Sequence, residues 1–209
     1  MRTSQERLAL VLESSDLGLW DWDIKSNQTK RNPWCAKVLG CELEQLNQDS
    51  RLWNDAIHPQ DRIEVLNSIE RHLKGETQKH SIEYRLISHR GEEHWILDTG
   101  KVVSRDRNGL PTRMCGVHSD ITEQKQVQES LELAASVYNN SSEAMSVQDD
   151  QGLIITINAA FTSITGYTEE EVLQKNIRIL QCSRTPRSQY DEMNRAIRDS
   201  GYWQGELWI

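Results

Sequence analysis

The sequence predicts an α+β fold that occurs twice in the chain, complete in the first copy and partial in the second. The main observation is an internal repeat. A nine-residue segment that begins at Asn32 lines up with one that begins at Asn158, and the same offset of 126 carries Glu44 onto Glu170. In both copies, segments with the period-two alternation of strands flank segments with helical spacing. Gly-containing dipeptides between the later strands of the first copy indicate antiparallel hairpins.

The first copy, residues 17–120, begins with two strands and a short helix. The strands are predicted over residues 17–24 and 28–31. Asn32 is a favoured N-cap residue, and Gly40 suits the left-handed conformation in which many helices end.

A longer helix and three strands complete the first copy. The helix is predicted to start within residues 58–61, because Pro59 suits a first turn and Asp61 complements the positive helix end, and to stop near Gly75. Strands are predicted over residues 79–88, 92–104 and 112–119, joined at Arg90-Gly91 and Asn108-Gly109.

The rest of the chain repeats this order in part. Residues 1–16 and 121–140 each read as an amphipathic helix. The second copy, residues 141–209, has predicted strands over 144–149 and 153–157 and a long helix from about Pro186 to Gly201. Residues 203–209 match the third strand of the first copy, so we expect the second copy to be cut off after that strand.

Charge and hydropathy exclude several kinds of partner. The net charge is −8 and no basic stripe could neutralise several phosphates, so we expect no nucleic-acid binding. No run of about 18 apolar residues could span a bilayer, and residues 1–12 lack the apolar stretch of a secretory signal. We expect these residues to be cytoplasmic and without membrane contact, which leaves open a membrane anchor elsewhere in a longer protein.

No metal site or catalytic site is expected. The four cysteines, Cys35, Cys41, Cys115 and Cys182, form no Cys-x-x-Cys pair and have no histidine at metal-ligand spacing. The sequence contains no P-loop, no nucleophile elbow and no complete kinase or cyclase signature. We therefore expect that this part of the protein is not an enzyme.

Four short segments of the first copy form a characteristic set: Leu19-Trp20-Asp21-Trp22-Asp23, Ile57-His58-Pro59-Gln60-Asp61-Arg62, Glu83-Tyr84-Arg85 and Asp120-Ile121-Thr122. Together they resemble the PAS family with its C-terminal PAC half, and the resemblance covers nearly the whole chain. The second copy resembles the PAS type with Asn158-Ala159-Ala160-Phe161 and Ile164-Thr165-Gly166-Tyr167, often found upstream of diguanylate cyclase (GGDEF) and phosphodiesterase (EAL) domains. The resemblance implies a five-stranded antiparallel sheet with helices on one face, enclosing a small pocket.

Aromatic side chains are the candidates for lining that pocket. Period-two alternation places Trp20, Trp22 and Ile24 on one face of a strand. A small-molecule ligand in the first copy is one interpretation, and core packing without a ligand is the other. The pocket candidates are Trp20, Trp22, Trp34, Trp53, Tyr84 and Trp95.

The sequence favours neither haem nor flavin, and no cofactor is predicted. Haem-binding PAS modules take their axial ligand from the long helix, but His72 lies at the helix end, where we expect it to be solvated. The segment 176–181, Asn-Ile-Arg-Ile-Leu-Gln, resembles the flavin-binding segment of light-sensing LOV modules. Ile177 stands in the place of the photoactive cysteine, and Cys182 would not replace it.

The predicted helix over residues 121–140 is the candidate for signal transmission and dimerisation. The segment 120–123, Asp-Ile-Thr-Glu, has the form of a capping box. Val127, Leu131, Ala134 and Tyr138 follow the 4-3-4 spacing of a seam that two helices share, so we predict a homodimer through this helix or the N-terminal one. The transmission candidates are Asp120, Ile121, Thr122, Val127, Leu131 and Ala134.

The leading functional hypothesis is a non-catalytic input module of a bacterial signalling protein. A ligand or partner would shift the helix over residues 121–140 between two packings and so regulate an output domain. The resemblance of the second copy suggests cyclic-di-GMP turnover as the output, with a sensor histidine kinase as the alternative. A passive dimerisation scaffold and a cofactor-bearing redox or light sensor are the competing classes.

Overall fold

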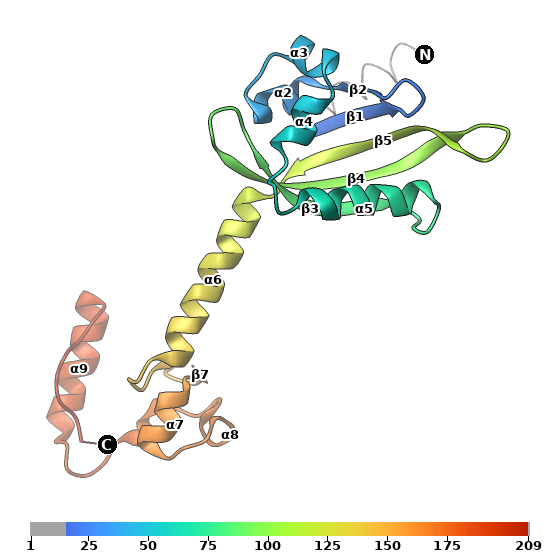
Figure 1. The fold of residues 1–209 in the computed structure, drawn as a ribbon. Coiled ribbons are helices and arrows are strands. Elements are labelled where there is room, and N and C mark those ends of the chain that lie inside the picture. Colours follow the sequence, from blue (N-terminus) through green and yellow to red (C-terminus); the bar gives the residue numbers. More distant parts are fainter. Residues whose placement is uncertain (1–15, 209) are drawn as a thin grey trace, which may run out of the picture. The chain divides into compact units, whose positions relative to one another are not determined.

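The computed structural model describes residues 16–208, which form two compact units that meet in the chain between Gln128 and Glu129 (Figure 1). The helix predicted over residues 1–16 lies outside the described residues except for its last position. Each unit is described separately below.

The first unit contains a five-stranded antiparallel sheet with the order β2-β1-β5-β4-β3. The chain enters the sheet at β1, the second strand from one edge, and β5, β4 and β3 follow it toward the other edge. This arrangement confirms the predicted fold class. The strands are β1 (Leu17–Asp23), β2 (Gln28–Arg31), β3 (His80–Ile87), β4 (Glu93–Arg105) and β5 (Pro111–Asp120).

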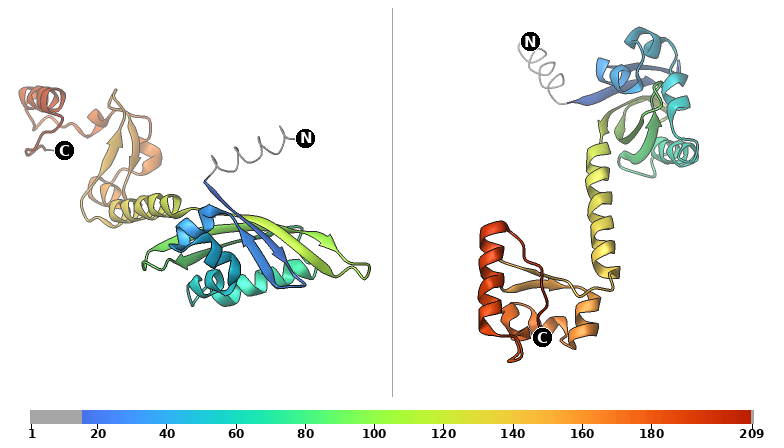
Figure 2. Two further views of the ribbon diagram at one scale, coloured as in Figure 1. Left: turned by 90° about the horizontal axis from the view of Figure 1, so that it is seen from above. Right: turned by 90° about the vertical axis from the view of Figure 1, so that its left-hand side faces the viewer.

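Helices between β2 and β3 cover one face of this sheet, as Figure 2 shows. Apolar side chains of these helices meet the inner residues of β3 and β4 in one core, around Leu39, Trp53, Tyr84 and Ile96. Burying each large apolar side chain contributes about 1.5–3 kcal/mol. The helices are α2 (Pro33–Leu39), α3 (Leu43–Gln48), α4 (Arg51–Ala56) and α5 (Arg62–Leu73).

The start of α5 differs from the prediction. The helix begins at Arg62, and His58 to Asp61 form a turn before it. The Asp61 carboxylate makes no cap hydrogen bond; it accepts two from the Arg85 guanidinium, at 2.9 and 2.6 Å. Both carboxylate oxygens of Asp61 are thus engaged by Arg85, whose backbone N–H also donates to Oδ2 at 2.9 Å, so Asp61 is bonded to β3 rather than to its own helix.

The second unit has its own smaller core, built on Ile154, Ile157, Phe161 and Val172. Its strands pair in a two-stranded antiparallel sheet. Residues 203–208, the described part of the strand predicted over residues 203–209, are not a strand. Within residues 129–208 no strand corresponds to β4, so this segment has no strand to pair with. The backbone carbonyl of Trp208 instead accepts from the Thr185 hydroxyl. The elements are β6 (Ser146–Gln148), β7 (Ile154–Ile157), α7 (Ala159–Thr165), α8 (Glu169–Val172), η1 (Ile177–Leu180) and α9 (Arg187–Ser200).

One asparagine occupies the same position in both units and makes the same pair of bonds. Asn32 Oδ1 accepts from Leu19 N–H and Asn32 Nδ2 donates to the Leu17 carbonyl, at 3.0 and 2.8 Å. Asn158 bonds Met145 N–H and the Glu143 carbonyl in the same way, at 2.9 and 2.8 Å. All three positions are related by the offset of 126, so the repeat extends to individual atoms.

Both asparagines occupy the N-cap position that the sequence predicts, but only one makes the side-chain bond of a cap. Asn158 Oδ1 accepts from Phe161 N–H at 3.0 Å as well as from Met145 N–H, whereas Asn32 makes no side-chain bond to the α2 backbone. Asn32 Oδ1 accepts from Leu19 N–H of β1. The N-cap position is therefore as predicted in both units, and the side-chain cap bond forms in the second unit.

The helix α6 (Thr122–Asn140) follows β5 directly. Asp120 Oδ1 accepts from Thr122 N–H as predicted, at 2.8 Å, but the first helical bond runs from Lys125 N–H to the Ile121 carbonyl. Asp120 thus precedes the N-cap position, and its other oxygen meets His94 Nδ1 at 2.9 Å. Asp120 therefore does not form the predicted capping box, and its side chain instead contacts His94 of β4. Within residues 16–208, no helix combines the length and apolar character needed to cross a bilayer.

Candidate ligand-binding site

A row of five residues crosses the inner face of the sheet and forms the floor of the candidate site. The strand register places one residue from each strand in line. Residues opposite each other in an antiparallel sheet point to the same face. From β2 to β3, the row is Arg31, Trp20, Gly116, Gly100 and His80.

The two glycines make room for the indole of Trp20. A Cβ atom at Gly100 or at Gly116 would overlap the six-membered ring of Trp20. The indole therefore lies across β5 and β4 in a slot that any side chain would fill. Its Nε1 donates to Asp98 Oδ1 at 2.8 Å.

Asp98 is a buried carboxylate between two buried histidines. Its Oδ2 lies 3.3 Å from His118 Nε2 and 3.4 Å from His80 Nε2. The His80 contact is electrostatic, since its alignment is too poor for a hydrogen bond. Burial by itself raises the pKa of Asp98, but His118 and then His80 oppose it and hold the pKa below its ordinary value. Asp98 is therefore an ionised group in the interior.

Aromatic rings and a thiol enclose this cluster. The Trp53 ring stacks on His118 with centroids 4.4 Å apart, and Trp53 Nε1 donates to the Tyr84 hydroxyl at 2.8 Å. Desolvation raises the pKa of Tyr84 well above its usual value and that of Cys35 to about 12. Both groups are therefore neutral at physiological pH, and Cys35 is not a reactive thiolate.

A cavity of about 500 Å³ lies against these groups. Its size falls in the range of small-molecule sites. Four of the six predicted aromatic residues line it, namely Trp20, Trp22, Trp53 and Tyr84.

The other two aromatic candidates lie elsewhere, which corrects the prediction for them. The Trp34 ring packs over Gly18, outside the cavity. Trp95 lies on the opposite face of β4 from Ile96 and Asp98, beneath Arg85 and Lys125, whose cations are 5.7 and 4.8 Å from its ring. Period-two alternation alone could not exclude Trp95, because the inward parity of β4 is fixed only by its register with β3.

Trp95 instead belongs to the base of α6. The backbone N–H of Trp95 donates to Thr122 Oγ1 at 2.9 Å, and its backbone carbonyl accepts from Ile121 N–H at 2.8 Å. Lys125 also binds Glu83 of β3 at 2.7 Å. Three of the predicted transmission residues, Asp120, Ile121 and Thr122, are thus bonded to His94 or Trp95 of β4. The other three, Val127, Leu131 and Ala134, are exposed.

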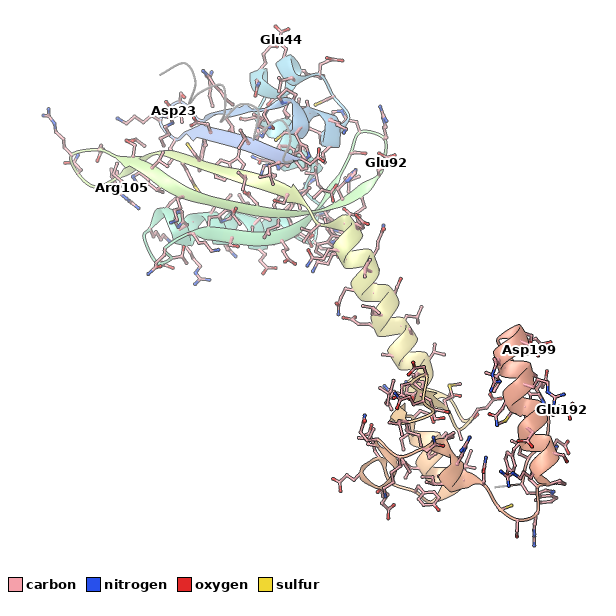
Figure 3. All side chains as sticks on the ribbon, turned by 180° about the vertical axis from the view of Figure 1, so that it is seen from behind. Asp23, Glu44, Glu92, Arg105, Glu192 and Asp199 are labelled. Atoms are coloured by element: carbon pink, nitrogen blue, oxygen red, sulfur yellow. The ribbon has the colours of Figure 1, made fainter. Side chains whose placement is uncertain are left out.

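The ionisable residues that Figure 3 labels lie apart from one another on the surface. Figure 3 shows Asp23, Glu44, Glu92 and Arg105 projecting outward from separate elements of the first unit, and Glu192 and Asp199 from α9. Within residues 16–208, no group of histidine, cysteine, aspartate and glutamate side chains has the arrangement of a metal site.

Two family models match the chain, and both describe a PAS fold. One matches residues 28–118 and the other residues 132–207. The chain belongs to the PAS family. The first match lies within the first unit, and the second match lies within the second unit.

Signalling proteins from several bacteria contain similar PAS regions. Sensor protein FixL of Bradyrhizobium diazoefficiens is 25% identical over 190 residues, which are 89% of this chain and 37% of FixL. "Probable diguanylate cyclase DgcE" of Escherichia coli is 25% identical over 176 residues, 80% of this chain and 15% of DgcE. The chain therefore spans well under half of each of these relatives.

A solved structure supports the fold of the first PAS domain. The "Sensory Box Histidine Kinase/Response Regulator" from Burkholderia thailandensis E264 is 29% identical, with a TM-score of 0.54, and the match covers 62% of this chain and 95% of that one. The PAS domains here are thus sensory domains of the kind found in signalling proteins.

The residues of this PAS chain do not fit the haem and flavin sites considered above. His72 is buried rather than solvated: its Nε2 accepts from Val102 N–H at 3.1 Å and its Nδ1 lies 3.1 Å from the Thr77 carbonyl. Desolvation lowers its pKa, consistent with a neutral ring that fastens α5 to β4. In the second PAS domain, Ile177 begins the short helix η1 and offers no nucleophile.

Sequence reasoning missed the polar half of the site. Arg31, His80, Asp98 and His118 were not singled out, nor were Gly100 and Gly116. One signal was available for His80, which lies two residues before Ile82 on the face that alternation assigns to the interior. The other positions depend on which residues face each other across the sheet.

Proposed function

We propose that the first PAS domain senses a small molecule in this cavity and transmits its state through α6. One observation supports this more than any other. Residues on opposite faces of β3 and β4 contact the cavity and the N-terminal end of α6: Tyr84 and Asp98 line the cavity, and Glu83 and Trp95 bond to the helix. Any change in the cavity that moves these strands also moves the contacts of α6.

We propose cyclic-di-GMP turnover as the output, in a cytoplasmic protein. The support is the similarity of this chain to DgcE and the resemblance of the second PAS domain to those found upstream of diguanylate cyclase and phosphodiesterase domains. All four cysteines are free thiols, which suits a reducing compartment. The chemistry of the output lies outside residues 1–209 and rests on analogy.

A histidine kinase is the second candidate output. The match to FixL covers more of this chain than the match to DgcE, and "Blue-light-activated histidine kinase" of Brucella ovis is 25% identical over 126 residues. Sequencing the gene beyond the codon for Ile209 distinguishes the two outputs directly.

The test of transmission removes one contact at the base of α6. Thr122→Val deletes the acceptor of Trp95 N–H without changing charge, and Thr122→Ser retains it. In the protein encoded by the whole gene, we expect Thr122→Val to change basal output by at least about twofold and Thr122→Ser to leave it unchanged. Output is measured as cyclic-di-GMP by mass spectrometry, or as autophosphorylation if the gene encodes a kinase.

Stability must be measured on the same variants. Loss of one partly buried hydrogen bond costs about 1 kcal/mol, which leaves the domain folded. A second variant, Lys125→Gln, removes the ion pair with Glu83. If Thr122→Val and Lys125→Gln both leave output at the wild-type level, the proposal of transmission through α6 is wrong, and the passive scaffold becomes the better description.

A further inference from the structure

Arg31 presents an unpaired cation to the cavity. It ends β2, where Asn47 binds its backbone on both sides, with N–H to Oδ1 at 2.7 Å and Nδ2 to the carbonyl at 3.3 Å. Its pairing with Trp20 places its side chain on the inner face of the sheet. The guanidinium carbon lies 5.5 Å from the centre of the Trp53 ring. Asn47 thus holds the backbone of Arg31, and the Trp53 ring lies against its guanidinium.

Two donors of this guanidinium are enclosed without a partner. Arg31 Nε and Nη1 have no hydrogen bond, and among residues 16–208 no carboxylate lies within ion-pair distance of Arg31. An arginine stays protonated at any physiological pH. Buried charges in folded proteins are otherwise paired or hydrogen-bonded, because the desolvation of an unpaired charge is costly.

The other arginines of the cavity wall have partners. Arg51 binds the Asp49 carboxylate, and Arg62 donates to the carbonyls of Ile57 and Asp55. Asp98 is engaged by Trp20 and flanked by its two histidines, so it is not available to Arg31 as a counter-ion. An acidic group that enters the cavity would meet Arg31 as the unused donor.

The rest of the wall selects the body of such a molecule. The indoles of Trp20, Trp22 and Trp53 supply flat apolar surfaces, and Met114 and Ile57 add aliphatic ones. Stacking favours planar rings over flexible chains. The cavity volume of about 500 Å³ is large enough for one or two fused rings.

We propose that the cavity binds a small aromatic carboxylate, with the carboxylate held by the fork of Arg31 and the ring among the tryptophans. This rests on the proposed function of the first PAS domain as a small-molecule sensor and adds the class of ligand. Charge-assisted bidentate bonds of this type strongly favour a carboxylate over a neutral isostere.

The experiment compares three probes of the same shape on the full 209-residue chain. They are 2-naphthoate, the neutral 2-naphthalenemethanol and the cationic 2-naphthylmethylamine, with binding followed by calorimetry and by tryptophan fluorescence. We expect naphthoate to bind about ten- to a hundredfold more tightly than the alcohol and the amine to bind least.

Variants assign the preference to one residue. Arg31→Gln should abolish the preference for naphthoate and leave the affinity for the alcohol unchanged. Arg51→Gln removes an equal charge from the same wall, but one that Asp49 already neutralises, so its preference should match wild type. Arg31→Gln loses the contact of the guanidinium with the Trp53 ring but no ion pair, so it should melt close to the wild-type temperature.

Different failures have different meanings. If naphthoate and the alcohol bind wild type equally, the carboxylate assignment is wrong while the cavity remains a ligand site. If Arg31→Gln keeps the full preference, another group holds the acid and the assignment to Arg31 is wrong. If none of the three probes binds wild type, the ligand class is overturned, and transmission through α6 is still decided independently by Thr122→Val.

Discussion

At the scale of single residues, the first PAS domain is organised by one ionised carboxylate. Asp98 receives the Trp20 indole N–H and faces two imidazoles, and all four side chains are buried. A buried charge of this kind adds little net stability compared with an apolar core, but removing it leaves its partners unsatisfied. Its value here is positional, because it fixes Trp20 and His118 on the cavity wall.

Asp98→Asn tests that role. The amide can still accept from Trp20 but no longer carries the charge opposite the histidines, so we expect the free energy of unfolding at pH 7 to fall by about 3 kcal/mol. The folded-state pKa of Asp98 is below its ordinary value, so its contribution is present above about pH 4 and is lost as pH falls. The difference between wild type and variant should therefore narrow between about pH 5 and pH 2.

Urea titrations across that range provide the measurement. Asp55→Asn, an exposed carboxylate at the cavity rim, is the matched control and should remain within about 0.5 kcal/mol of wild type at every pH. A gap that stays constant down to pH 2 would show that Asp98 is not ionised in the folded domain.

At the scale of elements, the equivalent asparagines Asn32 and Asn158 have different numbers of partners. Each bonds an N–H and a carbonyl of the first strand of its unit. Asn158 additionally donates to the Tyr138 carbonyl in the last turn of α6, at 3.0 Å. It is 1% exposed, so these bonds form out of contact with water. Asn158 thereby bonds both to the residues around β6 and to the C-terminal end of α6.

Asn158→Asp should detach that helix end. Aspartate keeps the acceptor for Met145 and Phe161 but cannot donate to the carbonyls of Tyr138 and Glu143, so we expect the second unit to lose about 2–3 kcal/mol. Hydrogen exchange of the whole chain should accelerate over residues 136–146. Asn32→Asp, which loses only the bond to Leu17, serves as the comparison in the first unit and should leave residues 136–146 unchanged.

Unchanged exchange over residues 136–146 in Asn158→Asp would mean that Asn158 does not hold the end of α6. The assignment of roles to the two asparagines would then rest on the strand contacts alone.

At the scale of the whole molecule, α6 is the covalent link between the two units, and it leaves an apolar stripe uncovered. Val127 and Leu131 are 55% and 61% exposed, and Ala134 lies on the same face at helical spacing. Leu133 and Val137 extend the apolar surface to one side. The predicted dimer through this helix stays a proposal, with a second copy of the chain as the partner.

Leu131→Glu tests the proposed dimer. In light scattering after size exclusion at tens of micromolar, wild type should have twice the chain mass of 24.2 kDa. A buried carboxylate in a two-helix seam is strongly unfavourable, so the variant should dissociate at least about tenfold more readily. Ser136→Glu places the same charge on the opposite face of α6 and should remain dimeric. A monomeric wild type at this concentration would contradict the proposal.

The sequence by itself determined the order of elements, the duplication and the ends of most helices and strands. Local chemistry is sufficient for these, because Gly40, Gly166 and Gly201 all adopt the left-handed conformation that ends a helix, and Asn108-Gly109 closes a hairpin. Trp20, Trp22, Trp53 and Tyr84 line the cavity, and that they contact a ligand stays a prediction.

Only the tertiary structure decided which residues meet. Arg31, Trp20, Gly116, Gly100 and His80 come from five strands, and nothing local fixes the register that aligns them. The same long-range pairing turned Trp95 away from the cavity, buried His72 against β4 and bound the Asp61 carboxylate to Arg85 of β3. A polar side chain takes the strongest partner that folding brings to it, and that partner is distant in the sequence.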